Sequence, residues 1–305
     1  MISLFKALSR LPWPVLYGLG NVLRFLAFNV AGYRRKVIEK NLGIMFPNAS
    51  RNERATMIRD FQRGFGDLAV EALKGLSMSE AELVKRVKVE NPELLQPYID
   101  HEQPLLILTL HQANVEWIVQ RIAQYFPCPV AGIYKPMHNA TADALIMAAR
   151  SRYGVPVAMK RAGREILRQR KAYRCMLLAA DQSPISREKR FWYPFFSRPA
   201  PFYYGPQTIA EATGNPVIFA HPRRLRRGYY SIRWEILAEA PYADNTAVLE
   251  RYIEACERSI REQPASWWIS NKKWKSPKPF EAEAFAAAQN RRPDRPPQLV
   301  TAAMA

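Results

Sequence analysis

The sequence has few cysteines and lacks the motifs of several hydrolytic and metal-dependent enzyme classes. Its three cysteines, Cys128, Cys175 and Cys256, are widely spaced and form no Cys-x-x-Cys pair. This pattern indicates neither a disulfide framework nor a zinc site, and a reducing, cytoplasmic setting fits it best. The chain has no His-Glu-x-x-His metal motif and no Gly-x-Ser-x-Gly elbow that would supply a serine nucleophile.

Acidic residues are also scarce: 27 of them face 45 lysines and arginines, which gives a net charge of +18. Such a surface attracts polyanions, namely nucleic acid, an anionic membrane face, a phosphorylated substrate or an acidic carrier protein. The basic residues are clustered within residues 160–174, 187–190, 223–227 and 272–278. Each cluster is equally consistent with a solvated helix face or loop, so charge alone does not choose the partner.

The most apolar stretch, residues 11–33, is interrupted by Asn21, Arg24 and Asn29 and is followed by the basic triplet 34–36. A charge at the centre of a spanning helix costs about 2.5–3.5 kcal/mol on insertion scales. No small-residue cleavage site follows the stretch, which argues against a removable signal peptide. Residues 1–36 are therefore predicted to form a membrane-associated helix that lies in the interface. The alternative is a buried core helix.

The rest of the chain predicts one α/β domain over residues 37–280, followed by a flexible tail over residues 281–305. Ser50 and Glu53 have the spacing of a capping box for a helix over 51–75, and Ser79 begins a shorter helix. Apolar strands are then expected to alternate with helices, which indicates a mostly parallel central sheet covered by helices. The expected strands are 105–110, 130–134, 155–159, 175–180, 217–220 and 229–236, and the expected helices are 113–125, 139–152, 163–171, 206–213 and 246–262.

Polar residues follow two of these strands at the edge where parallel sheets bind ligands. His111 ends the first run, and Asp181-Gln182 ends the second. Asn114 is a plausible N-cap, so Glu116 would lie in the opening turn of the next helix and could fold back onto the His111 imidazole. A carboxylate on one ring nitrogen leaves the other nitrogen free to accept a proton. This arrangement activates an alcohol without a metal ion.

Ordered blocks along residues 10–278 resemble the lauroyl/myristoyl acyltransferases of bacterial lipid A biosynthesis, which are related to glycerolipid acyltransferases with an H-x4-D/E box. The segment His111 to Glu116 resembles the family's H-x-x-N-x-E catalytic box. Two positions depart from the family pattern: Ser197 stands where the family usually has glycine, and Asn271 stands where histidine is common. The other matching blocks are Tyr33-Arg34-Arg35, Asn41-Leu42, Phe46-Pro47, Tyr134-Lys135-Pro136, Arg150 to Gly154, Asp181-Gln182, Pro194 to Ala200 and Trp268 to Lys275.

The resemblance implies a glycerolipid-acyltransferase-like fold and an acyl transfer for which no cofactor and no metal are expected. His111 would act as general base, oriented by Glu116, on a hydroxyl of a lipid A precursor. The donor would be the thioester of acyl carrier protein or coenzyme A. Besides the carrier protein, the implied partners are a phosphorylated glycolipid and an anionic membrane surface rather than nucleic acid. The implied location is the cytoplasmic face of the inner membrane.

Further site residues are expected around this pair. Arg150, and after it Arg152, would stabilise the carbonyl oxygen or bind a substrate phosphate, although an ion pair of Arg150 with Asp143 or Glu116 is the alternative. Asp181 and Asn114 are expected to position substrate. Three aromatic residues are candidates for an acyl pocket, with burial in the core as the alternative: Trp192, Phe195 and Phe196.

Other functions remain open at this point. Within the same class, the acceptor would be a lysophospholipid, an ornithine lipid or a pigment-type alcohol. From other classes, a non-catalytic basic protein would bind membrane or nucleic acid, and a hydrolase would use the same His–Glu pair. His101, His138 and His221 have no partner at useful spacing and are expected to be structural.

Overall fold

The computed structural model describes residues 2–137, 139–169, 172–184, 190–196 and 198–274. His138, Ser197 and the predicted tail over 281–305 therefore lie outside the described residues. The chain begins with helices α1 (Ile2–Leu8), α2 (Trp13–Phe25), the π-helical turn η1 (Leu26–Val30), α3 (Arg35–Met45) and α4 (Arg51–Lys74). The predicted capping box is confirmed: the Ser50 hydroxyl accepts from the Glu53 amide, and the Glu53 carboxylate accepts from the Ser50 amide. Ser79 caps α5 (Glu80–Arg86), because its hydroxyl accepts from the Glu82 amide.

Seven strands form one sheet in the order β1-β9-β8-β2-β5-β3-β4. Every neighbouring pair is parallel except β8 and β9, which form an antiparallel hairpin. The predicted α/β fold with a mostly parallel sheet is thus confirmed. The strands are β1 (Val87–Val89), β2 (Leu106–Thr109), β3 (Val130–Tyr134), β4 (Val155–Ala158), β5 (Cys175–Ala179), β8 (Val217–Arg226) and β9 (Tyr229–Ala238).

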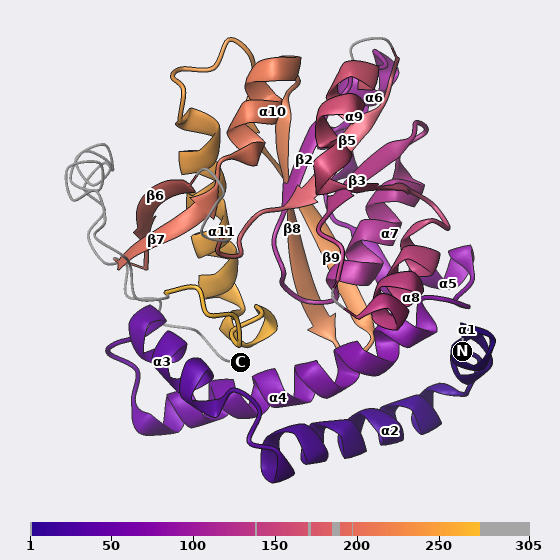
Figure 1. The fold of residues 1–305 in the computed structure, drawn as a ribbon, viewed down its shortest axis with the longest axis vertical. Coiled ribbons are helices and arrows are strands. Elements are labelled where there is room, and N and C mark those ends of the chain that lie inside the picture. The colour runs from indigo at the N-terminus through magenta and orange to yellow at the C-terminus, as the bar shows by residue number, and fades with distance from the viewer. Residues whose placement is uncertain (1, 138, 170–171, 185–189, 197, 275–305) are drawn as a thin grey trace.

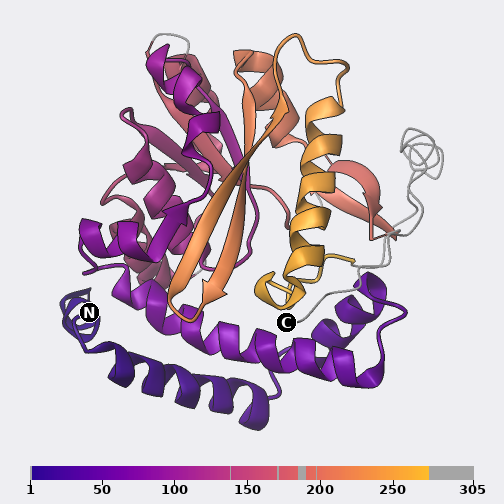
Figure 2. The ribbon, with the colours of Figure 1, turned by 180° about the vertical axis from the view of Figure 1, so that it is seen from behind.

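Helices cover both faces of this sheet (Figures 1 and 2). Leu106 and Leu108 point into a core shared with α10 and α11, whereas Leu105 and Ile107 point into a core shared with α5 and α7. This alternation explains why three of the four residues of β2 are apolar: both of its faces are buried. The covering helices are α6 (Gln96–Asp100), α7 (Val115–Tyr125), α8 (Ala140–Arg150), α9 (Ala162–Gln169), α10 (Gly205–Thr213) and α11 (Ala247–Glu262).

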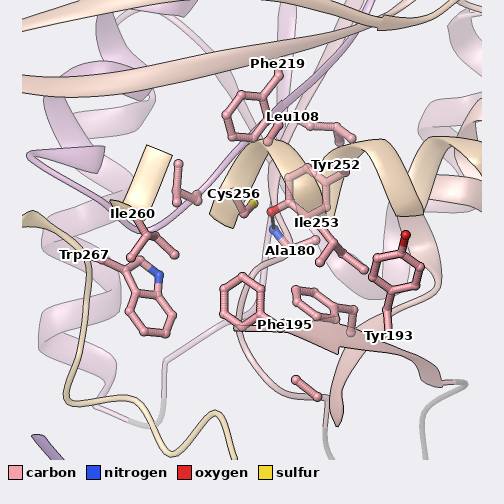
Figure 3. Packing of buried hydrophobic residues seen from close by; sticks show 14 of the residues in the cluster. Leu108, Ala180, Tyr193, Phe195, Phe219, Tyr252, Ile253, Cys256, Ile260 and Trp267 are labelled. Carbon is pink, nitrogen blue, oxygen red and sulfur yellow. Dashed lines mark hydrogen bonds between the residues drawn. The ribbon is translucent and has the colours of Figure 1, made fainter. Parts of the chain in front are cut away.

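A separate hairpin, β6 (Arg190–Phe195) with β7 (Arg198–Tyr203), packs beside α11 and was not predicted as strands. Its aromatic side chains meet the apolar face of α11, as Figure 3 shows for Tyr193 and Phe195 beside Ile253. The pair therefore extends the hydrophobic core away from the main sheet.

The N-terminal helix α2 lies along α4, at the end of the sheet toward which β8 points (Figure 1). The two helices approach closely at Gly20 and Gly66, where a Cβ added to Gly20 would lie 2.7 Å from the Gly66 carbonyl oxygen. In α2, Leu16 and Gly20 are buried, but five large apolar side chains are 45–55% exposed: Val15, Leu19, Val22, Leu23 and Phe25. The helix is therefore a surface helix and not the buried core helix of the alternative prediction.

Within the described residues, no single helix has both the length and the apolar character needed to cross a membrane. The segments Trp13–Val30 and Arg35–Met45 meet these criteria only when taken together, and they are bent by 90° relative to each other.

Candidate active site

The parallel register of β2 and β5 brings two polar strand ends together. Thr109 is paired with Ala179 in neighbouring strands. His111 and Asp181 each lie two residues after this pair, so they leave the sheet side by side. Tyr252 of α11 holds both ends. Its hydroxyl accepts from the Ala180 amide at 2.9 Å (Figure 3) and donates to the Thr109 carbonyl at 2.8 Å. The strand register and this clamp fix the position of the two side chains.

His111 and Asp181 are directly hydrogen-bonded. The His111 Nδ1 and Asp181 Oδ1 atoms are 2.6 Å apart, and the His111 amide donates to the same oxygen at 3.1 Å. The other carboxylate oxygen accepts from Trp267 Nε1 at 2.9 Å. Asp181 is 1% exposed, whereas the His111 side chain is 32% exposed. A buried carboxylate on Nδ1 leaves Nε2 as the nitrogen that can exchange a proton with a ligand.

The surroundings of this pair change the acidity of both residues. Burial lowers the pKa of His111, but the charge and hydrogen bond of Asp181 outweigh it and the net pKa lies above the ordinary value. Burial raises the pKa of Asp181, but the charge of His111, together with the hydrogen bonds from His111 and Trp267, brings it below its ordinary value. The pair therefore favours an ionised Asp181 beside an imidazole of increased basicity.

Glu116 has a different partner from the one expected. Its carboxylate is bound on both oxygens by Arg150, with Nε–Oε2 at 2.9 Å and Nη2–Oε1 at 2.7 Å. This is the ion-pair alternative for Arg150, and Asp181 occupies the ring nitrogen that Glu116 was expected to bind. Glu116 still acts on His111 through its charge, which raises the pKa of the imidazole, while Arg150 lowers it. Both side chains are mostly buried, at 16% and 21% exposure.

A cavity of about 890 Å³ lies beside His111, Glu116 and Arg150, which all line it. Its volume is within the usual range for small-molecule sites. The walls come from α4, α7, α8, α9, α10 and strands β3 to β5, and they are largely apolar. Representative apolar lining residues are Val119, Val130, Ile133, Ile146, Met147 and Ile166.

Two of the expected substrate-binding residues have structural partners. Asn114 is the N-cap of α7, as predicted: its side-chain oxygen accepts from the Trp117 amide at 3.1 Å, and its Nδ2 donates to Glu71 at 2.9 Å. Arg152 donates to the carbonyls of Gly75 and Met78, at 2.6 and 2.5 Å, just beyond the end of α4. Both side chains thus hold elements in place around the cavity, and Asn114 also lines it.

The three aromatic candidates for an acyl pocket lie elsewhere. Phe195 and Phe196 are 0% and 3% exposed in the core around α11, and Phe195 stacks on Trp274 with ring centroids 5.6 Å apart. Trp192 is half-buried in β6. The lining of the cavity, within the described chain, includes none of the three. Phe195 and Phe196 pack in the core around α11, and mainly aliphatic residues line the cavity instead.

The remaining described histidines have partners outside the cavity. His221 Nε2 lies 2.6 Å from Glu235 Oε2, and His101 Nδ1 lies 2.7 Å from the Pro97 carbonyl oxygen. Neither histidine lines the cavity.

Comparison with known proteins identifies the family. The family model described as bacterial lipid A biosynthesis acyltransferase matches residues 1–276. The chain belongs to this family. A lipid A biosynthesis acyltransferase of Haemophilus influenzae is 22% identical over 286 residues, which are 90% of this chain and 89% of the relative. A lipid A biosynthesis lauroyltransferase of Escherichia coli strain K12 is 23% identical over 267 residues, 86% and 87% of the two chains. The protein is thus an enzyme of acyl transfer in lipid A biosynthesis, which the non-catalytic alternative does not fit.

The closing segment of the acyltransferase contributes site residues that were not expected from the sequence. Besides the Trp267 bond to Asp181, the Trp268 amide donates to the His111 carbonyl at 2.9 Å, and the Ala113 amide donates to the Ser266 carbonyl at 2.8 Å. Ala113 has φ of +53°, so the loop after β2 is held in a left-handed turn. In the sequence, these residues are visible only as a tryptophan-rich segment that contains Trp267, Trp268 and Trp274. Its spacing along the chain gives no indication that it contacts His111.

Lys273 is a second unexpected residue near the site. It is fully buried, its Nζ donates to the Pro201 carbonyl at 2.7 Å, and it lies 3.3 Å from the centre of the Phe202 ring. Burial lowers the pKa of Lys273 to about 7, although Asp181 acts in the opposite direction. The charge of Lys273 in turn lowers the pKa of Asp181.

Proposed function

We propose that the acyltransferase moves a fatty acyl group from an acyl thioester to a hydroxyl of a lipid A precursor. His111 is the general base, and Asp181 orients it. The observation that carries this proposal is the His111–Asp181 hydrogen bond at the wall of a large apolar cavity. Membership of the lipid A family supports the choice of acceptor.

His111 serves in both halves of the proposed reaction, first as proton acceptor and then as proton donor. His111 Nε2 takes the proton of the acceptor hydroxyl while its oxygen attacks the thioester carbonyl carbon. The new C–O bond forms, the C–S bond breaks, and the imidazolium returns the proton to the leaving thiolate. Asp181 stabilises the imidazolium between these steps.

Arg150 is assigned to the charge that develops on the carbonyl oxygen. A guanidinium has five N–H donors, and the two hydrogen bonds from Arg150 to Glu116 use two of its three nitrogens. Donors aimed at a developing oxyanion are a large source of rate enhancement in acyl transfer. Glu116, the acidic residue of the H-x4-E box, holds the Arg150 guanidinium at the wall of the cavity. Its role in the proposal is therefore to position Arg150.

The apolar walls between α7 and α8 are assigned to the acyl chain. The donor is an acyl carrier protein or coenzyme A, and the excess of basic residues suits an acidic carrier and a phosphorylated acceptor. The exposed apolar face of α2 is assigned to the interface of an anionic membrane, the cytoplasmic face of the inner membrane.

Mass spectrometry of lipid A from cells with and without the protein tests the acceptor. The proposal predicts that lipid A lacks one acyl chain when the gene is deleted, and that a plasmid copy restores it. An unchanged acylation pattern would contradict the lipid A precursor as acceptor and would favour a lysophospholipid, an ornithine lipid or a pigment-type alcohol.

A further inference from the structure

A basic surface lies next to the cavity on helix α9 and the preceding turn η3 (Met159–Arg161). Its exposed cationic residues are Lys160, Arg161, Arg164 and Arg168. The one acidic residue of the segment 159–169, Glu165, is 3% exposed and lies 2.9 Å from Arg174. Glu165 also lies 3.5 Å from Arg168. The outward face of α9 and η3 therefore carries a net positive charge, to which Lys160, Arg161 and Arg164 contribute most.

The opposite side of the same helix belongs to the cavity. Ala162, Gly163 and Ile166 line it together with His111. Gly163 is exposed, and a Cβ built on it would meet nothing within 4 Å. A ligand passing Gly163 from outside would thus enter the space that leads to the proposed general base.

Exposed apolar side chains mark this side of the cavity. Met137, Val155 and Met159 line the cavity and are 46%, 38% and 38% exposed, so the cavity reaches the molecular surface beside η3. Leu167, which is 59% exposed, lies between Arg164 and Arg168 on α9. Apolar groups within a charged surface are typical of protein docking sites.

The position of α9 distinguishes a protein partner from a lipid surface. Helix α2, with its exposed apolar face, lies at one end of the molecule, and α9 lies at the opposite end in both views (Figures 1 and 2). If α2 rests on a membrane, α9 lies at the far end of the fold from that membrane. An anionic bilayer contacting α2 would not reach it.

We propose that α9 and η3 form the docking surface for an acidic carrier protein that presents the acyl chain on a phosphopantetheine arm. This inference rests on the proposed function and names the surface that its donor uses. The basic residues attract the acidic face of the carrier, Leu167 makes an apolar contact, and the arm enters beside Gly163. The acyl thioester then reaches His111 within one continuous cavity.

The test compares a protein-bound donor with a small one. Acyl transfer is measured with acyl carrier protein thioester and with acyl-pantetheine, using detergent-dispersed lipid A precursor. The docking variant is R161E/R164E, and K85E/K88E on α5 and β1 is the control with the same charge change at exposed lysines. Binding of the unacylated carrier protein is titrated separately, so docking is judged independently of catalysis.

The expected result is a loss of about tenfold or more in kcat/KM for the carrier-bound donor in R161E/R164E at low salt. Carrier affinity falls in parallel, whereas kcat/KM for acyl-pantetheine is unchanged and K85E/K88E behaves like the wild type. The neutral variant R161Q/R164Q shows a smaller loss of the same kind and guards against an effect of charge reversal on folding.

Three results for R161E/R164E would overturn the inference. The first is carrier affinity equal to that of the wild type, and the second is an equal loss of kcat/KM with both donors. The third is a variant that binds anionic vesicles more weakly but binds the carrier as the wild type does. The proposed function fails differently, because the wild-type protein would then transfer acyl groups from neither donor, whatever its affinity for the carrier.

Discussion

The basicity of His111 depends on opposing effects from its neighbours. Burial disfavours the imidazolium, whereas the Asp181 carboxylate at 2.6 Å favours it, and the pKa of His111 ends above 6.5. A general base acts only when it is unprotonated. The rate is therefore expected to fall as the pH decreases through this raised pKa, and the acid limb of the pH–rate profile has its midpoint above the ordinary value of histidine.

Substitution Asp181→Asn tests the orienting role. The variant is expected to lose about 10²- to 10⁴-fold in kcat, because the imidazole loses its fixed orientation and the counter-charge of its protonated form. Its acid limb should also move to lower pH, since burial then acts on His111 without Asp181. The measurement is kcat against pH with D100N, at an exposed aspartate, as the control. Unchanged kcat and an unmoved acid limb in D181N would refute this role.

The Glu116–Arg150 pair predicts pH shifts of opposite sign. Glu116→Gln removes a charge that raises the pKa of His111, so the acid limb should move to lower pH. Arg150→Met removes a charge that lowers this pKa, so the limb should move to higher pH, together with a lower kcat if the guanidinium stabilises the oxyanion. The double variant should return the limb toward the wild-type position. Shifts of the same sign in both single variants would contradict the assignment.

At the scale of single residues, the sequence predicts His111 as a strand-end candidate but does not predict the carboxylate that it contacts. His111 and Asp181 are both visible as polar residues after apolar strands, yet they are 70 positions apart, and their contact depends on β5 pairing directly with β2. Glu116 is five positions from His111 and is the natural choice from spacing. Only the three-dimensional position of Arg150 shows that this carboxylate is engaged elsewhere.

Among the elements, α11 supports the site most directly. Tyr252 inserts its hydroxyl between the ends of β2 and β5 and satisfies one buried amide and one buried carbonyl. The succession of apolar strands and helices predicts most elements of the main sheet, because its central strands are buried on both faces. It misses the β6–β7 hairpin, whose prolines and dense aromatic residues resemble a loop or core segment rather than alternating strands.

Tyr252→Phe is expected to destabilise the protein by about 2–4 kcal/mol, since it leaves two buried backbone groups without a partner. It should also reduce kcat, because these groups lie two residues before His111 and one residue before Asp181. Urea denaturation measures the stability, with Y98F as the control because the Tyr98 hydroxyl bonds to Glu239 in an exposed position. A stability loss equal to that of Y98F would show that the clamp contributes little.

Over the whole molecule, the two ends of the fold differ in character. One end carries the exposed apolar face of α2, and the other carries the basic α9. The sequence predicts the apolar segment near the N-terminus and the excess of charge. It does not predict that α2 packs on α4 through Gly20 and Gly66, because this depends on the close approach of two backbones.

The exposed face of α2 and η1 is expected to bind lipid. Val22→Glu with Leu26→Glu should weaken binding to anionic phospholipid vesicles by at least about a hundredfold, because two apolar side chains no longer enter the bilayer. Flotation with vesicles measures the binding. The control is V84E, at an apolar residue of α5 that is 39% exposed. Equal flotation of the double variant and the control would exclude this face as the lipid-binding surface.

The central claim is that His111 performs the acyl transfer, and a reconstituted reaction tests it most directly. Purified wild-type protein and H111A are each incubated with acyl carrier protein thioester and a lipid A precursor, and the lipid product is detected by mass spectrometry. The wild type is predicted to add one acyl chain, and H111A is predicted to form product at a rate lower by at least about 10²-fold. Product formation by H111A at the wild-type rate would contradict the account.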